Sequence, residues 1–112
     1  MKRFEYALCG LLMLSAIGHF IGTFTGYQIG TEVFVWSLSA TAFAIAVVFL
    51  NILRIQRPDD RPIRWGAVGF ALAWAVLALM FGASQGSFFD PRALTHAALS
   101  LALAVTGAFR SA

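Results

Sequence analysis

Two histidines are the residues of this sequence with the most specific chemistry. His19 and His96 are its only histidines, and each lies within a long apolar stretch. Neutral imidazole is a ligand of haem iron, and two facing helices that each carry a histidine can supply both axial ligands of a haem b. A histidine can also hydrogen-bond the oxygen of a quinone. We therefore expect His19 and His96 to be the cofactor-binding residues if the chain holds haem b or a quinone.

The same two histidines have a simpler structural interpretation. A neutral histidine inside a membrane commonly hydrogen-bonds a Ser, a Thr or a backbone carbonyl of another helix, and such bonds contribute about 0.6 kcal/mol on average. Two histidines do not predict a zinc site, which usually takes three or four protein ligands. Glu32 and Asp90 would have to complete a metal site. Periodicity does not fix the order of helices around a bundle, so the sequence leaves open whether the two rings meet.

The composition predicts that both histidines lie inside a membrane. The chain has 112 residues, of which 60% are hydrophobic and 12% are charged. Soluble domains are about 45–50% apolar and about 25% charged. Four stretches reach the length of about 20 residues that a helix needs to cross a bilayer, and they cover residues 4–27, 33–55, 63–83 and 91–110. Backbone groups in lipid must be bonded within their own element, which favours helices.

We therefore predict an all-α fold, in which residues 1–112 form a single transmembrane domain with four helices in a bundle. Beyond Glu5, no acidic or basic residue is expected well inside a span. Prolines at 58 and 62 separate the second and third stretches, and Asp90 followed by Pro91 is typical of an N-cap and a first helical residue. The apolar run that starts after Arg3 continues to Tyr27 without a clear cleavage site, so we expect a retained helix rather than a signal peptide.

The positive charges predict the orientation in the membrane. In a four-span topology, seven basic residues fall on one side: Lys2, Arg3, Arg54, Arg57, Arg61, Arg64 and Arg110. Only Arg92 falls on the other side, beside Glu32 and Asp90. Lys and Arg in short loops favour the cytoplasmic side. This distribution predicts a multi-pass protein of a bacterial inner membrane with the N and C termini in the cytoplasm. Charge that sets topology gives no reason to expect a nucleic acid as partner.

The faces of the expected helices, placed at about 100° per residue, carry small and polar residues. Gly18, Gly22 and Gly26 repeat at intervals of four, a spacing that lets two helices approach closely. The partner helix is either in the same chain or in a second copy. Polar residues that we expect to line the interior are Ser15, Thr23, Ser37, Thr41, Asn51 and Ser100.

Three features of the first two helices resemble small, uncharacterised bacterial inner-membrane proteins with four helices. These features are the Gly18-His19 pair, Trp36 at the start of the second helix and Asn51 near its end. The resemblance implies the same fold and brings no established activity. The size and helix number also resemble the small multidrug resistance transporters. That family has a glutamate within its first helix, whereas this sequence has Glu5 only at the start of the stretch.

Three classes of function are compatible with these observations. The first is a non-enzymatic accessory or scaffold component of a membrane complex, with the lipid bilayer, further copies or other subunits as partners. The second is an electron-transfer subunit that binds haem b or a quinone through His19 and His96. The third is a small dimeric transporter or channel, against which we count the expected lack of a buried carboxylate or Arg. We do not expect an enzyme, because no nucleophile with its base and orienting residue can be assembled.

Overall fold

Four helices make up the fold in the computed structural model, which describes residues 1–87 and 89–109. They are α1 (Lys2–Gly26), α2 (Glu32–Gln56), α3 (Arg61–Ser84) and α4 (Pro91–Phe109). Each is long and apolar enough to cross a membrane, and the molecule extends over 45 Å, more than the bilayer hydrocarbon core of about 30 Å. The predicted all-α fold with four span-length helices is confirmed. Arg110, the predicted last residue of the fourth helix, lies outside the described residues.

Side-chain caps fix where three of the helices begin. The Thr31 hydroxyl accepts a hydrogen bond from the Phe34 amide at 3.3 Å, and Asp60 accepts one from the Ile63 amide at 3.1 Å. The predicted cap Asp90 accepts one from the Arg92 amide at 2.9 Å. Such caps bond amides that the first helical turn leaves without partners. They explain why α3 starts two residues before the predicted apolar stretch, because the cap at Asp60 determines the start and hydropathy does not.

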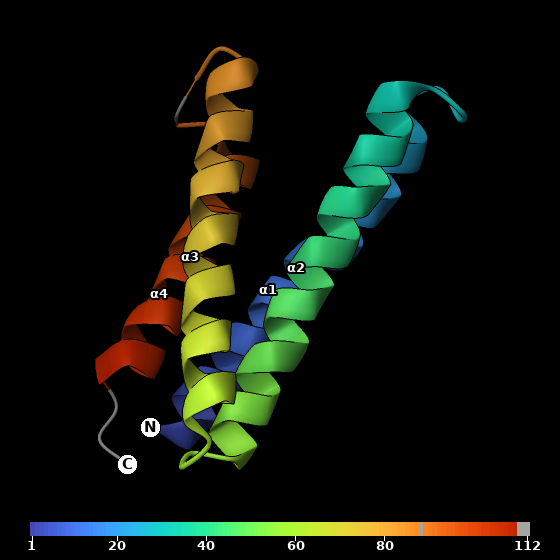
Figure 1. The fold of residues 1–112 in the computed structure, drawn as a ribbon. Helices are drawn as coiled ribbons and strands as arrows, with labels where there is room; N and C mark the ends of the chain where they lie inside the picture. The colour runs from blue at the N-terminus through green and yellow to red at the C-terminus, as the bar shows by residue number, and fades with distance from the viewer. Residues whose placement is uncertain (88, 110–112) are drawn as a thin grey trace.

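The helices form two hairpins that share one end. α1 and α2 make the first hairpin and α3 and α4 the second, and contacts run around the bundle from α1 to α2, α3, α4 and back to α1. The hairpins approach each other where α1 and α3 begin, and they diverge toward the turns at residues 27–31 and 85–90 (Figure 1). We call the first of these the basic end, because Lys2, Arg3, Arg57 and Arg61 lie there.

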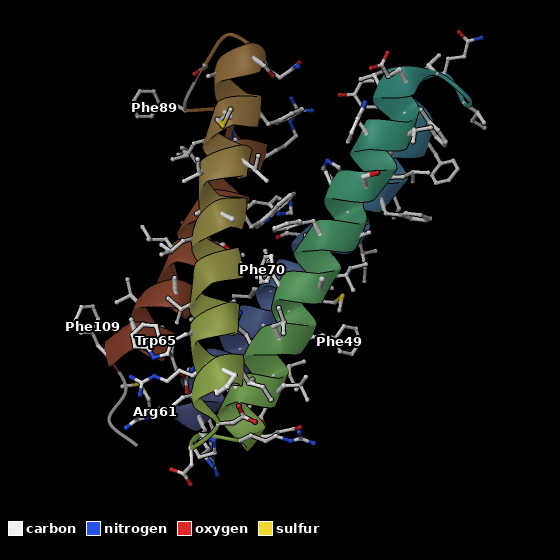
Figure 2. The ribbon with its side chains drawn as sticks, in the orientation of Figure 1. Phe49, Arg61, Trp65, Phe70, Phe89 and Phe109 are labelled. Atoms are coloured by element: carbon white, nitrogen blue, oxygen red, sulfur yellow. The ribbon has the colours of Figure 1, made fainter. Side chains whose placement is uncertain are left out.

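The core lies between the hairpins and is built of aliphatic side chains. Leu12, Ile55 and Leu103 are completely buried, and small residues such as Ala44 and Ala104 fill the space between them. Large apolar side chains also cover the outside of the bundle, where Phe49 and Phe109 project away from it (Figure 2). An apolar outer surface of this extent is a signature of contact with lipid or with other apolar partners.

Candidate functional site: a histidine pair between two hairpins

The structure brings His19 and His96 together in the bundle. Their ring centroids are 6.1 Å apart, and the ring planes stand at 78°. His19 comes from α1 and is half-buried, whereas His96 comes from α4 and is buried. The pair therefore joins the two hairpins, and the question that periodicity left open is answered: the two rings meet.

Each ring is oriented by a hydrogen bond within its own hairpin. His19 Nδ1 and Thr41 Oγ1 are 2.7 Å apart, and the indole Nε1–H of Trp74 donates to His96 Nδ1 at 3.3 Å. Because an indole can only donate, Nδ1 of His96 is an acceptor, and the neutral ring carries its proton on Nε2. The Thr41 hydroxyl donates to the Ser37 carbonyl at 3.3 Å. Because a hydroxyl has one hydrogen, which either this carbonyl or His19 Nδ1 can accept, both neutral tautomers of His19 fit these contacts.

Most of the other predicted interior residues are also buried. Thr23, Thr41, Asn51 and Ser100 are buried, and Ser37 is half-buried. The hydroxyls of Thr23 and Ser37 bond at 2.6 Å, and Ser100 donates to the Ala71 carbonyl at 2.7 Å. Ser15 is half-buried like Ser37, but its hydroxyl donates to the Leu11 carbonyl of its own helix at 3.0 Å.

Polar bonds close each hairpin on itself. Seven of the described interhelical hydrogen bonds lie within a hairpin, three between α1 and α2 and four between α3 and α4. The hairpins meet each other mainly through aliphatic packing and ring contacts. Phe43 of α2 stacks on Trp74 of α3 at 5.6 Å and meets Phe70 edge-on at 5.9 Å. A hydrogen bond between the Ser15 backbone of α1 and the His96 ring of α4 also joins them. The histidine pair thus sits at an interface where two internally bonded units pack mostly through apolar groups.

A groove lies beside the histidine pair, on the outer surface between α1 and α4. It has a volume of about 490 Å³ and is lined by Leu11, Leu14, Ser15, Thr95, Ala98 and Leu99. Ser15 lies about one helical turn from His19, and Thr95 directly precedes His96. The backbone of Ser15 also approaches the His96 ring. The groove and the histidines are therefore neighbours across the same pair of helices.

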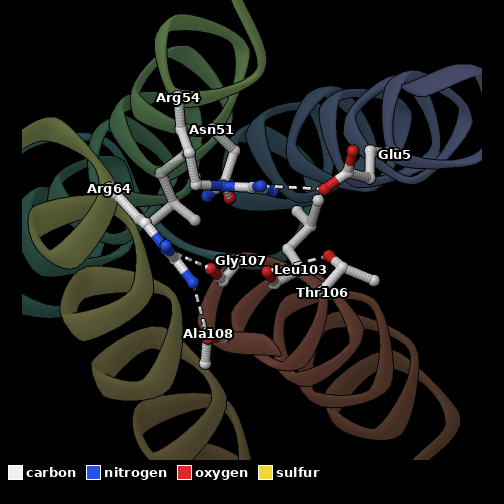
Figure 3. Close-up of polar contacts among 9 residues, drawn as sticks. Glu5, Asn51, Arg54, Arg64, Leu103, Thr106, Gly107 and Ala108 are labelled. Carbon is white, nitrogen blue, oxygen red and sulfur yellow. Dashed lines mark hydrogen bonds and ion pairs between the residues drawn. The ribbon is translucent and has the colours of Figure 1, made fainter. Parts of the chain in front are cut away.

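A second polar cluster, near the basic end, was missed by the sequence analysis. Arg54 and Glu5 form an ion pair at 2.8 Å, with 3% and 0% of their side-chain surfaces exposed (Figure 3). Arg54 Nε donates to Asn51 Oδ1 at 3.1 Å, and Asn51 Nδ2 donates to the Val47 carbonyl at 2.9 Å. The expectation that no carboxylate or Arg would be buried is therefore wrong. The argument against a transporter depended on that expectation and no longer holds.

The burial of this pair has a physical reason and left a signal in the sequence. A charge can be buried when an opposite charge and hydrogen bonds replace water. Glu5 lies in the first turn of α1 and Arg54 in the last turn of α2, so both lie at the same depth in adjacent helices. Arg54 also follows Asn51 by three residues, which places both on one face of α2. Counting Arg54 only as a topology signal overlooked this match.

Arg64 bonds the end of α4 instead of pointing into solvent. Its Nε donates to the Gly107 carbonyl at 2.8 Å and its Nη2 to the Ala108 carbonyl at 2.7 Å. The last carbonyls of a helix have no partner within the helix and carry partial negative charge, which explains the contact. Among the arginines assigned to topology, Arg57 and Arg61 are exposed at the basic end, whereas Arg54 and Arg64 also hold helices together.

An exposed ion pair lies at the start of α4, at the opposite end from the Glu5–Arg54 cluster. Asp90 accepts hydrogen bonds from the Arg92 guanidinium at 2.9 and 3.2 Å. These bonds, together with the one from the Arg92 amide, lower the pKa of Asp90 from its ordinary value of 3.8 to about 2. Asp90 therefore stays ionised, and able to cap α4, until the pH falls well below 3.8.

The predicted glycine motif does not pack inside the chain. Gly18, Gly22 and Gly26 are exposed, and a Cβ atom added at any of them would meet nothing within 4 Å. Close approach to a helix of the same chain is therefore not what the structure shows, and approach to a second copy stays a prediction. The tightly packed glycine is Gly107, where a Cβ would lie 2.9 Å from Val68 Cγ2 and 3.0 Å from Arg54 Nε.

Replacing Gly107 with alanine is expected to destabilise the bundle by about 1–3 kcal/mol, the usual cost of overpacking a core. The added methyl group would press on Arg54 and strain its bond to Asn51. Thermal unfolding in detergent, followed by circular dichroism, measures the effect. Gly69→Ala is the matched control, because a Cβ there meets nothing within 4 Å. Equal midpoints for the two variants would contradict the packing described here.

Comparisons with known proteins give no relative from which to transfer a function. No family model, no curated protein and no solved structure matches this chain.

Proposed function

We propose that this chain is a non-enzymatic accessory or scaffold subunit of a larger membrane complex. The supporting observation is the use of the interior polar side chains. Thr23, Thr41 and Ser100 bond to the other helix of their own hairpin, as structural polar groups in membrane bundles do. Side chains engaged in this way hold helices together and are poorly placed to act as nucleophile and base on a substrate.

We place the subunit in a bacterial inner membrane with its termini in the cytoplasm. The basic end carries Lys2, Arg3, Arg57 and Arg61, partly offset by Asp59 and Asp60. The opposite end carries Arg92, which is paired with Asp90. An excess of Lys and Arg in short segments favours the cytoplasmic side of such a membrane, so the basic end is the cytoplasmic one in this proposal.

An experiment on the open glycine face of α1, a candidate contact surface, tests this proposal. Gly18 and Gly22 are replaced together by leucine, and the wild type and variant are extracted into mild detergent or native nanodiscs. The mass of the extracted assembly is then measured. We expect the wild type to be heavier than one chain, through a second copy or another subunit, and the double variant to lose that mass. Gly69→Leu, another exposed glycine with open space around it, should leave the mass unchanged. A wild type that extracts as a single chain would overturn the proposal.

A second candidate function is favoured by the spacing of the histidine rings. We propose as the alternative an electron-transfer subunit that binds haem b or a quinone through His19 and His96. Two imidazoles that share one metal ion through bonds of about 2 Å hold their ring centroids about 6 Å apart, and the observed separation is 6.1 Å. A quinone head would instead sit beside the two rings and use Nε2 of His19.

A further inference from the structure

We infer that the histidine pair and the groove beside it form one binding site for a lipid-soluble quinone, which enters from the bilayer between α1 and α4. The quinone ring would lie at His19 and His96, and its apolar chain would lie in the groove. This inference rests on the second candidate function and deepens it, because it selects the ligand class and its route of entry.

His19 offers the ring nitrogen that a quinone head can bond. Its Nδ1 is engaged with Thr41 at 2.7 Å, which leaves Nε2, and this atom donates or accepts according to the tautomer. A quinone carbonyl accepts a hydrogen bond, whereas a quinol hydroxyl can also donate one, so His19 can bond either form. The His96 ring is already hydrogen-bonded by Trp74 and by the Ser15 backbone. His19 is the more accessible of the two rings, because it is half-buried and His96 is buried.

The groove suits a hydrocarbon chain better than a polar ligand. Its volume of about 490 Å³ falls within the range of about 300–1,000 Å³ that is usual for ligand pockets. Its two hydroxyls are already bonded within their own helices, Ser15 to the Leu11 carbonyl at 3.0 Å and Thr95 to the Pro91 carbonyl at 2.7 Å. The remaining lining is aliphatic. A polar ligand would find few unsatisfied partners there, whereas an apolar chain needs none.

A ligand that enters this site from the bilayer breaks few hydrogen bonds between helices. The groove lies on the outer surface of span-length helices, so its opening faces lipid if the helices are inserted. It also lies at the boundary between the hairpins, whereas the seven interhelical bonds described above join helices of the same hairpin. A molecule that moves between α1 and α4 toward His19 therefore breaks none of those seven bonds, and it passes the contact between the Ser15 backbone and His96 that crosses this boundary.

The test uses the full chain in lipid nanodiscs and decylubiquinone as the probe. Binding is followed by quenching of tryptophan fluorescence, since Trp74 contacts His96 at a ring separation of 5.6 Å. We expect saturable binding that weakens about tenfold in His19→Leu, which removes the hydrogen-bonding nitrogens of the ring. Ala98→Phe, which fills the groove, should weaken it by a similar factor. The matched control is Ala46→Phe, because Ala46 is also an exposed alanine but lies on α2, and it should bind like the wild type.

Absorption spectra of the same preparations distinguish this inference from the function on which it rests. Quinone binding with the variant pattern above and no haem bands supports the inference. A Soret band that disappears in both His19→Ala and His96→Ala keeps the electron-transfer function but overturns the quinone site. Binding that is equal in all variants overturns the site as described. No haem bands and no saturable binding would overturn both. Circular dichroism of each variant shows that the helices are retained.

Discussion

Replacing Arg54 with alanine is expected to lower the stability of the bundle by about 3–5 kcal/mol, the usual cost of breaking a buried ion pair from one side. The substitution would leave the Glu5 carboxylate, which is completely buried, without the guanidinium 2.8 Å away. It would also remove the donor that Asn51 accepts. Unfolding of the purified protein in mixed micelles, followed by circular dichroism, gives the free energy of unfolding.

A double replacement distinguishes the contribution of the ion pair to stability from that of side-chain packing. Arg54 is not fully compensated, because its Nη2 is buried without a hydrogen-bond partner among the described residues. Buried ion pairs of this kind can often be exchanged for apolar residues of similar volume at little cost. We therefore expect Glu5→Leu combined with Arg54→Met to recover most of the stability that Arg54→Ala loses. Arg57→Ala, an exposed arginine near the same end, is the control for lost positive charge. A double variant as unstable as Arg54→Ala would show that the site needs its charges.

The four helices were predictable because a bilayer sets the length of an apolar span. Hydropathy located α2 within one residue at each end, but it placed the start of α1 and of α3 two residues too late. Lys2 and Arg61 are polar, so they fall outside an apolar window, although nothing prevents them from being helical. The cap at Asp60 decides the start of α3, and it depends on a local hydrogen bond rather than on the mean polarity of a stretch.

The candidate site was only partly predictable, for a different reason. Residue type and depth identified His19 and His96, but their contact depends on the order of helices around the bundle, which a single helix does not encode. The Glu5–Arg54 pair was overlooked because charges near helix ends were assigned to topology. The glycine motif of α1 has no partner helix within the described residues, so only its packing against a second copy stays a prediction. Each discrepancy arises at a contact between helices and not within one.

Substitutions of Trp74 can distinguish its role in packing the two hairpins together from its role in orienting the His96 ring. Its ring is 5% exposed and stacks on Phe43 of the other hairpin, and its indole N–H bonds His96. Trp74→Ala removes both and is expected to cost about 3–5 kcal/mol of unfolding free energy. Trp74→Phe keeps a ring against Phe43 and loses the hydrogen bond, so its cost should be smaller, at about 1 kcal/mol.

Both Trp74 variants lose the indole donor, so both should change the orientation of His96, although they differ in stability. Without the indole donor, Nδ1 of His96 is no longer held as an acceptor, and its tautomer becomes free to change. Nitrogen NMR of labelled histidine in micelles should therefore show His96 protonated at Nε2 in the wild type and a mixture of tautomers in Trp74→Phe. Trp36→Ala, at an exposed tryptophan of α2, should change neither measurement. An unchanged His96 spectrum in Trp74→Phe would mean that another contact, such as the hydrogen bond with the Ser15 backbone of α1, is sufficient to hold the His96 tautomer.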